Sequence, residues 1–231
     1  MNYLLEALQW LSTGANWTGT DGILMRTFEH AWYSMLGVLL ASLIAIPLGI
    51  YIGHTGHLRT LAVTLLGGMR SLPTLGVLTI FGIWLGIGLA APMISFVVLA
   101  IPSILAGTYS GVEVASRDIV DAAHAQGMTG RQVITQVQLP LGIPLIIGGL
   151  RSASLQVIAT ATLAAYVGSG GLGRYLFLGL RTQNYALMVA CSLLVVALAI
   201  ASEILFMAIM RYFTHKNPGL AAIAATTQKV G

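Results

Sequence analysis

Long apolar runs recur along this chain, separated by short polar stretches. At about 20 residues, each run is long enough to cross the hydrocarbon core of a bilayer as a helix. The alternation of apolar and polar positions that marks membrane β-strands does not recur, which argues against a barrel. The pattern therefore predicts an all-α integral membrane protein with about five spans, at residues 32–53, 61–85, 92–111, 141–167 and 185–212.

Prolines lie inside four of these predicted spans. The second span is interrupted by Arg70-Ser71-Leu72-Pro73, and the first, third and fourth contain Pro47, Pro102 and Pro144. Proline removes a backbone donor and tends to kink a helix, although neighbouring membrane helices can satisfy the freed carbonyl. Two interpretations stay open here: ordinary membrane prolines, or mechanical hinges.

The composition agrees with a membrane location. Of the 231 residues, 57% are hydrophobic and only 8% are charged, whereas soluble domains carry roughly 25% charged residues. The net charge of +4 is spread without a basic run, so acidic phospholipid headgroups explain it better than nucleic acid does. The single cysteine, Cys191, excludes a disulfide framework and a cysteine-based metal site.

Positive charge predicts the orientation, because cytoplasmic loops of membrane proteins are enriched in Lys and Arg. Five spans place the termini on opposite sides. An outside N-terminus leaves only Arg26, Arg174 and Arg181 outside. It places a larger basic set in the cytoplasm, consisting of Arg59, Arg117, Arg131, Arg211, Lys216 and Lys229.

This orientation gives the expected organisation of the chain. Residues 1–31 form an extracytoplasmic or interfacial segment with a short helix around Tyr3–Leu11, and the N-terminus does not look like a signal peptide. Residues 32–212 form the transmembrane domain, with a cytoplasmic loop at 113–140, and residues 213–231 form a cytoplasmic tail. No segment is long and polar enough for a fused soluble domain.

The cytoplasmic loop contains a polar island at residues 121–140. It begins with Asp121-Ala122-Ala123, continues to Gly127, and ends with Val137-x-Leu139-Pro140. Small alanines let another surface approach closely. We expect a short helix that Gly127 breaks, a second turn of helix that begins at Thr129 or Gly130, and a return into the membrane at Pro140. The alternative is a loop that is merely solvated.

The island resembles the "EAA" loop in membrane subunits of ATP-binding-cassette importers, whose pattern is E-A-A-x3-G-x9-I-x-L-P. Asp121 replaces Glu and Val137 replaces Ile, and every spacing fits. The resemblance implies a MetI-like permease whose loop docks on an ATPase dimer. It also implies a second permease, identical or homologous, and an extracytoplasmic binding protein, in a prokaryotic cytoplasmic membrane. ATP and Mg would be bound by the ATPase, and this chain would carry neither a cofactor nor a catalytic site.

A second resemblance narrows the class of solute. Residues 149–180 and the run that begins at Arg70 resemble permeases for glycine betaine, choline, carnitine and related osmoprotectants, which show "IPSLALL", "GIRTA" and "ATLAA-IGAGGLG" runs. The resemblance extends from about residue 30 to 212. The departures from these runs are Thr74, Gly76, Val77, Tyr166 and Ser169.

Polar residues in the second and fourth spans are candidates for the translocation path or a permease dimer interface. An arginine about ten residues inside a span is costly and faces protein or water. At 100° per residue, Arg151, Ser154 and Thr162 share one face of the fourth helix, while Ser152, Gln156 and Thr160 share nearly the opposite face. The alternative is that Ser and Thr serve as packing contacts. The candidates are Arg70, Ser71, Pro73, Arg151, Ser154, Gln156, Thr160 and Thr162.

The glycine-rich run after the fourth span matches G-x-G-x-x-G literally, but no strand precedes it, so a dinucleotide site is rejected. We expect a flexible turn that forms part of an outer gate, through Gly168, Gly170, Gly171 and Gly173. The five histidines lack acidic partners at ligand spacing, so no metal site is expected.

Two rival classes remain. A secondary carrier would need ion-coupling carboxylates inside spans or an inverted repeat. Glu203 is the only acidic residue that we expect inside a span, and no repeat is visible. An intramembrane enzyme would need a nucleophile and a base, and no such set assembles. Quaternary ammonium recognition usually uses an aromatic cage. Aromatics are only 8% of the chain, so selectivity is expected to lie mainly in the separate binding protein.

Overall fold

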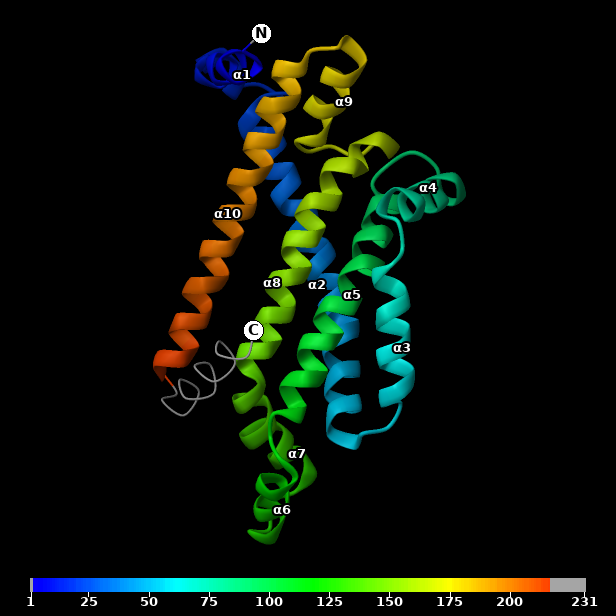
Figure 1. Cartoon of the computed structure of the whole chain (residues 1–231), viewed down its shortest axis with the longest axis vertical. Coiled ribbons are helices and arrows are strands. Elements are labelled where there is room, and N and C mark those ends of the chain that lie inside the picture. The colour runs from blue at the N-terminus through cyan, green and yellow to red at the C-terminus, as the bar shows by residue number, and fades with distance from the viewer. Residues whose placement is uncertain (1, 217–231) are drawn as a thin grey trace. The chain divides into compact units, whose positions relative to one another are not determined.

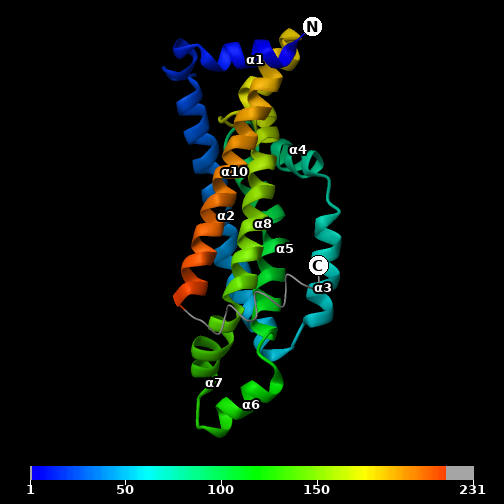
Figure 2. The same cartoon turned by 60° about the vertical axis from the view of Figure 1, so that its left-hand side comes forward.

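All regular structure in the described residues is helical, which confirms the all-α prediction. The computed structural model describes residues 2–216, apart from the side chains of Val63, Leu65, Arg70 and Lys216 (Figures 1 and 2). The tail expected at 213–231 therefore lies outside the description from residue 217 on. The elements are α1 (Tyr3–Ser12), η1 (Gly14–Trp17), α2 (Ile23–Thr55), α3 (Arg59–Arg70), α4 (Thr74–Leu85), α5 (Ala90–Glu113), α6 (Arg117–Ala125), α7 (Gly130–Gln132), η2 (Val133–Gln138), α8 (Leu139–Ala164), η3 (Ala165–Val167), α9 (Gly173–Thr182) and α10 (Tyr185–Lys216).

Among the described residues, four helical segments are long and apolar enough to cross a membrane: 23–55, 90–113, 130–167 and 185–215. The second predicted span is not one continuous helix, because α3 ends at Arg70 and α4 begins at Thr74. Pro73 has extended backbone angles and disfavours helix at the residue before it. The number of spans is five if this broken pair is taken as one crossing. By contrast, Pro47, Pro102 and Pro144 lie inside continuous helices.

The first span starts earlier than its sequence suggests. We expected it at residue 32, whereas α2 begins at Ile23. The added turns contain Arg26, Glu29 and His30, which make the segment look too polar for a span. Arg26 and Glu29 form an ion pair, and His30 is fully buried. The short helix expected around Tyr3–Leu11 is confirmed as α1.

The chain divides into two compact units. Unit 1 contains Met1–Ala41, Ser71–Ala100 and Ser154–Ser202, and unit 2 contains Ser42–Arg70, Ile101–Ala153 and Glu203–Gly231. The core of unit 1 is built around Ile23, Leu172, Tyr175, Leu187 and Cys191. Trp10 of α1 meets the ring of Tyr175 edge-on at 5.3 Å, which joins the N-terminal helix to this core.

In unit 2, α5 and α8 touch through their backbones. A Cβ atom on Gly107 would lie 2.7 Å from the Cα of Gly149, and one on Gly142 would lie 2.5 Å from the carbonyl oxygen of Gly111. Only glycine permits this approach. Close contact between small residues stabilises membrane helix pairs, because lipid is as apolar as the side chains and the hydrophobic effect favours neither. We call this contact the glycine seam, formed by Gly107, Gly111, Gly142 and Gly149.

The glycine seam yields a matched pair of variants on one helix. In Gly149→Ala, the new methyl would lie 2.7 Å from the carbonyl oxygen of Ser103, so the helices must separate. Overpacking of this kind costs about 1–3 kcal/mol, and we expect a lower thermal unfolding midpoint in detergent. Gly148→Ala meets nothing within 4 Å and should gain up to about 1 kcal/mol of helix propensity. Equal midpoints for the two variants would contradict the seam.

Candidate functional site

The polar island folds in unit 2 as two helical pieces joined at Gly127. The first piece, α6, ends in a Schellman motif: the amide of Gly127 donates to the carbonyl of His124 at 2.9 Å, and that of Met128 donates to Ala123 at 3.2 Å. Gly127 has φ of +83°, and a Cβ there would meet nothing within 4 Å. The requirement for glycine is therefore conformational and not steric.

The second helical piece begins where the sequence indicates. Thr129 is the N-cap of α7 and forms a capping box with Gln132, whose side-chain oxygen accepts from the Thr129 amide at 2.8 Å. Within unit 2, α6 packs against η2, and Figure 2 shows α6 and α7 lying beyond the ends of the long helices to which they connect. The cap and the Schellman motif together fix the angle between the two pieces.

The helix is not broken at Pro140, where we expect the chain to return into the membrane. Helical structure runs without a break from Gly130 through α8. Residues 133–138 form a π-helix, and the amide of Leu139 donates to the carbonyl of Ile134, five residues back. Proline cannot donate, and its ring clashes with the carbonyl four residues earlier. The wider π turn just before Pro140 relieves this conflict, and such turns occur frequently at functional sites.

The candidate coupling residues lie in two places. Asp121 and Ala122 are exposed on α6, while Ala123 is buried beneath them and Gly127 is exposed. The other group consists of Val137, Leu139 and Pro140, which are half-buried where η2 passes into α8. The exposed carboxylate of Asp121, beside small residues, is available to a docking partner.

Two side-chain contacts tie this region to the ends of other helices in unit 2, and our sequence reasoning missed both. The buried amide of Gln138 accepts a hydrogen bond from Nδ1 of His54, on the last turn of α2, at 2.8 Å. Arg59 of α3 pairs with Glu113 of α5 at 3.5 Å and lies 5.9 Å from the ring centre of Tyr109. The only sequence signal was a polar residue at an otherwise apolar helix end.

The candidate pathway residue Arg151 forms an ion pair with a residue of another long apolar helix. Its Nε donates to Oε2 of Glu203 at 2.8 Å, and its NH2 group contacts Oε1 of the same carboxylate. This is a bidentate fork between the middle of α8 and the middle of α10. The side chains remain 48% and 25% exposed in the single chain. The sequence places Arg151 and Glu203 inside predicted spans, but the hydrophobic pattern gives no sign that these two residues, 52 positions apart, form a pair.

The other pathway candidates differ from one another in burial and in hydrogen bonding. In unit 1, Ser154 and Thr160 are buried, Gln156 and Thr162 are half-buried, and the Thr160 hydroxyl donates to the Gln156 carbonyl at 2.8 Å. The buried Thr162 hydroxyl has no hydrogen-bond partner among the residues described. Bonds to the helix backbone fit the packing interpretation for Thr160. Ser71 and Pro73 are exposed, and the side chain of Arg70 lies outside the described residues.

The glycine-rich turn, which we expected to be flexible, is held in unit 1 by hydrogen bonds to two residues of α2. The amide of Gly171 donates to Oε2 of Glu29 at 2.9 Å, and that of Leu172 donates to Nδ1 of His30 at 3.3 Å. Nε2 of His30 lies 2.9 Å from the Ile158 carbonyl, so the neutral ring satisfies both groups when Nε2 carries its proton. Gly168 and Gly171 have positive φ, and a Cβ on Gly173 would meet the Thr162 carbonyl oxygen.

Glu203 is not the only acidic residue within a candidate span, as we expected it to be, because Glu29 lies in α2. Glu29 pairs with the buried Arg26 at 2.7 Å, and Arg26 contacts Asp21 as well. The hydroxyl of Tyr175 donates to the backbone carbonyl of Asp21. Burial raises the pKa of Tyr175 above its usual value, which keeps this donor protonated. The Glu29 carboxylate thus has two partners, the Arg26 guanidinium group and the Gly171 amide of the glycine-rich turn.

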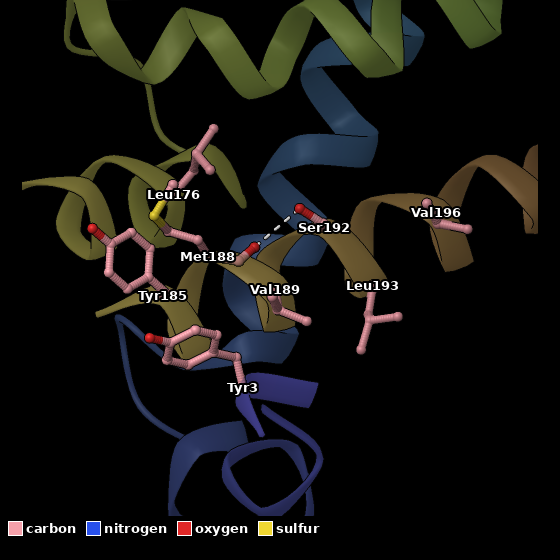
Figure 3. A pocket seen from close by; sticks show the side chains of 8 residues that line it. All are labelled: Tyr3, Leu176, Tyr185, Met188, Val189, Ser192, Leu193 and Val196. Atoms are coloured by element: carbon pink, nitrogen blue, oxygen red, sulfur yellow. Dashed lines mark hydrogen bonds between the residues drawn. The ribbon is translucent and has the colours of Figure 1, made fainter. Parts of the chain in front are cut away.

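A hollow of about 460 Å³ lies among α1, α9 and α10 in unit 1 (Figure 3). The Ser192 hydroxyl donates to the Met188 carbonyl at 3.0 Å, and the rings of Tyr3 and Tyr185 lie 5.4 Å apart at one side. No lining residue is charged, so the hollow offers nothing to an ionic solute. Among the described residues, no group of three or more His, Cys, Asp or Glu side chains is placed to hold a metal.

The fold, with its apolar spanning helices and a structured polar loop, is that of an importer permease. Residues 45–217 match the family described as the binding-protein-dependent transport system inner membrane component, and the chain belongs to this family. It is a multi-pass membrane protein. The inward-facing MetNI methionine ABC transporter has a chain with a similar fold. The TM-score is 0.72 at 20% identity, covering 83% of this chain and 96% of the other, which confirms the MetI-like fold.

Several curated relatives are similar over nearly their whole length. The glycine betaine/carnitine/choline transport system permease protein OpuCB of Bacillus subtilis is 29% identical, covering 94% of this chain and 96% of the relative. The choline transport system permease protein OpuBB of the same organism is 29% identical, covering 88% and 90%. The carnitine transport permease protein OpuCB of Listeria monocytogenes is 30% identical, covering 78% and 83%.

Proposed function

We propose that this chain forms the translocation path of an ATP-driven importer for a compatible solute such as glycine betaine, choline, carnitine or proline betaine. The observation that carries the proposal is the likeness to permeases named for glycine betaine, carnitine and choline, at up to 94% coverage of this chain. The sequence runs from Arg70 and from residue 149 to 180 support the same class.

The importer would contain further subunits. An ATP-binding-cassette ATPase dimer binds ATP and Mg and hydrolyses the ATP, and this chain has no catalytic role. A second permease, identical or homologous, completes the path with lipid around it, and an extracytoplasmic binding protein delivers the solute. Such a protein can supply the aromatic cage that quaternary ammonium groups favour.

Alternating access assigns a role to each region of the chain. Closure of the ATPase dimer pushes on the exposed face of α6 around Asp121, Ala122 and Gly127. The continuous helix from Gly130 carries this movement past Pro140 into α8, and the bundle opens towards the loaded binding protein. Hydrolysis then resets it inward. The proposed outer gate is the turn that contains Gly168, Gly170, Gly171 and Gly173, moving as one body with α2 because Glu29 and His30 hold it.

Uptake measurements test this function directly. The chain would be expressed with its ATPase and binding protein in cells that lack other osmoprotectant importers, and uptake of radiolabelled glycine betaine, choline and carnitine would be followed, with methionine as a comparison. We expect uptake of at least one osmoprotectant, and its loss when the ATPase is inactivated. Uptake that persists without the ATPase and follows an ion gradient would instead indicate a secondary carrier.

The orientation is part of the proposal: N-terminus outside and C-terminus in the cytoplasm. Cysteine labelling in intact cells tests it, in a Cys191→Ser background. Serine keeps the donor with which Cys191 contacts the Leu172 carbonyl. Thr129→Cys should be shielded from an impermeant thiol reagent, and Thr182→Cys should react, since both positions are exposed in the chain. The reverse labelling would overturn the orientation and the docking of α6.

Gly127 offers a second test of coupling. At φ of +83° a residue with a branched side chain is strained, by about 1–2 kcal/mol, which corresponds to a population change of roughly 5–30-fold. Gly127→Val should therefore lower uptake by a similar factor without loss of membrane insertion, while Gly127→Asn, which tolerates this conformation, should retain most of it. Gly130→Ala, in ordinary helical backbone, is the control. Equal uptake by Gly127→Val and Gly130→Ala would contradict the role of the Schellman motif.

A further inference from the structure

The Arg151–Glu203 pair has an unusual position for an ion pair. Each residue lies near the middle of its helix, Arg151 thirteenth in the 26-residue α8 and Glu203 nineteenth in the 32-residue α10. The other salt bridges among the described residues involve residues at or near helix ends or in the segment before α2. Both residues therefore lie several helical turns from either end of their helices.

The pair is also accessible from outside the single chain. Nearly half of the Arg151 side chain and a quarter of that of Glu203 are exposed. One turn before Arg151 on the same helix, Gly148 is exposed, and a Cβ there would meet nothing within 4 Å. The surface of α8 one turn from Arg151 is therefore left uncovered by the described part of the chain. Charged side chains inside spans face protein or a water-filled cavity, because exposure to hydrocarbon is costly.

We propose that Arg151 and Glu203 form a two-ended site for the solute. The solute's carboxylate takes the place of Glu203 on the guanidinium fork, while its quaternary ammonium group lies against the freed Glu203 carboxylate. The charges stay balanced throughout, because one ion pair becomes two. This inference rests on the proposed function, from which the solute chemistry comes, and assigns that chemistry to two residues of this chain.

The two ends differ in the bonds that they can form. A planar guanidinium group binds a carboxylate through two parallel N–H···O bonds. A quaternary ammonium has no N–H, so Glu203 can attract it by charge alone. Glycine betaine and carnitine carry both groups, whereas choline carries only the cation. Arg151 is therefore expected to matter most for zwitterions, and Glu203 for all of these solutes.

Neutral variants separate this role from a purely structural ion pair. The variants are Arg151→Met, Glu203→Gln and the double variant, compared with Arg211→Met, an exposed arginine further along α10. Each is expressed with the ATPase and binding protein, and KM and maximal rate are measured for glycine betaine and choline. Assembly is checked by copurification of the ATPase and by thermal unfolding.

The double variant gives the decisive result. Replacing both members of an ion pair leaves neither charge without its partner, and such a double replacement is often harmless to stability. A structural pair therefore predicts normal transport in the double variant, and that result would overturn the proposal. We expect instead an assembled complex whose KM for glycine betaine rises at least tenfold, with Arg211→Met unchanged. Arg151→Met should impair glycine betaine uptake at least tenfold more than choline uptake, and equal losses for the two solutes would also overturn it. Wild-type protein that takes up none of glycine betaine, choline and carnitine would instead refute the proposed function.

Discussion

The contact between the α5 and α8 backbones is the constraint on which unit 2 depends. Four glycines bring the two helices so close that a methyl group at Gly107, Gly142 or Gly149 would lie under 3 Å from the neighbouring backbone. Helices that are apolar on all sides gain little by exchanging lipid for one another, so close packing must supply the attraction. The seam also fixes α8, which carries Arg151 on one side and continues into the coupling region.

A second constraint, satisfaction of polar groups in the membrane, decides where charges lie. Every polar backbone group in hydrocarbon needs a partner within the protein. In unit 1, Glu29 and His30 accept from the amides of Gly171 and Leu172, which a tight glycine turn leaves outside any helix. In unit 2, Arg151 and Glu203 satisfy each other. The first arrangement is enclosed and complete, whereas the second is partly open, and this difference favours a structural role for one and a solute-facing role for the other.

Local features could be predicted from the sequence, and contacts between distant residues could not. The helical class, α1, the break at Gly127 and the start of helix at Thr129 follow from short-range rules of propensity, capping and backbone conformation. The start of α2 at Ile23 was missed because Arg26, Glu29 and His30 look too polar for a span until their partners are known. The partners of Glu29 and His30 are 142 and 128 residues away, and no periodicity reveals them. The same holds for His54 with Gln138, and for Arg151 with Glu203.

The course of the chain past Pro140 depends both on a local feature, the π-helix before the proline, and on a contact with a distant residue, His54. Pro140 marks the expected return of the chain into the membrane, and proline usually begins or breaks a helix. The structure instead widens the helix over Val133–Gln138, so that the helix continues into α8. A break there would have separated the docking region from the span by a flexible joint. A continuous helix transmits axial displacement, and the bond between Gln138 and His54 extends the same link to α2. If α6 docks on the ATPase as we propose, its movement reaches two spanning helices through hydrogen-bonded backbone and one partly buried side-chain contact.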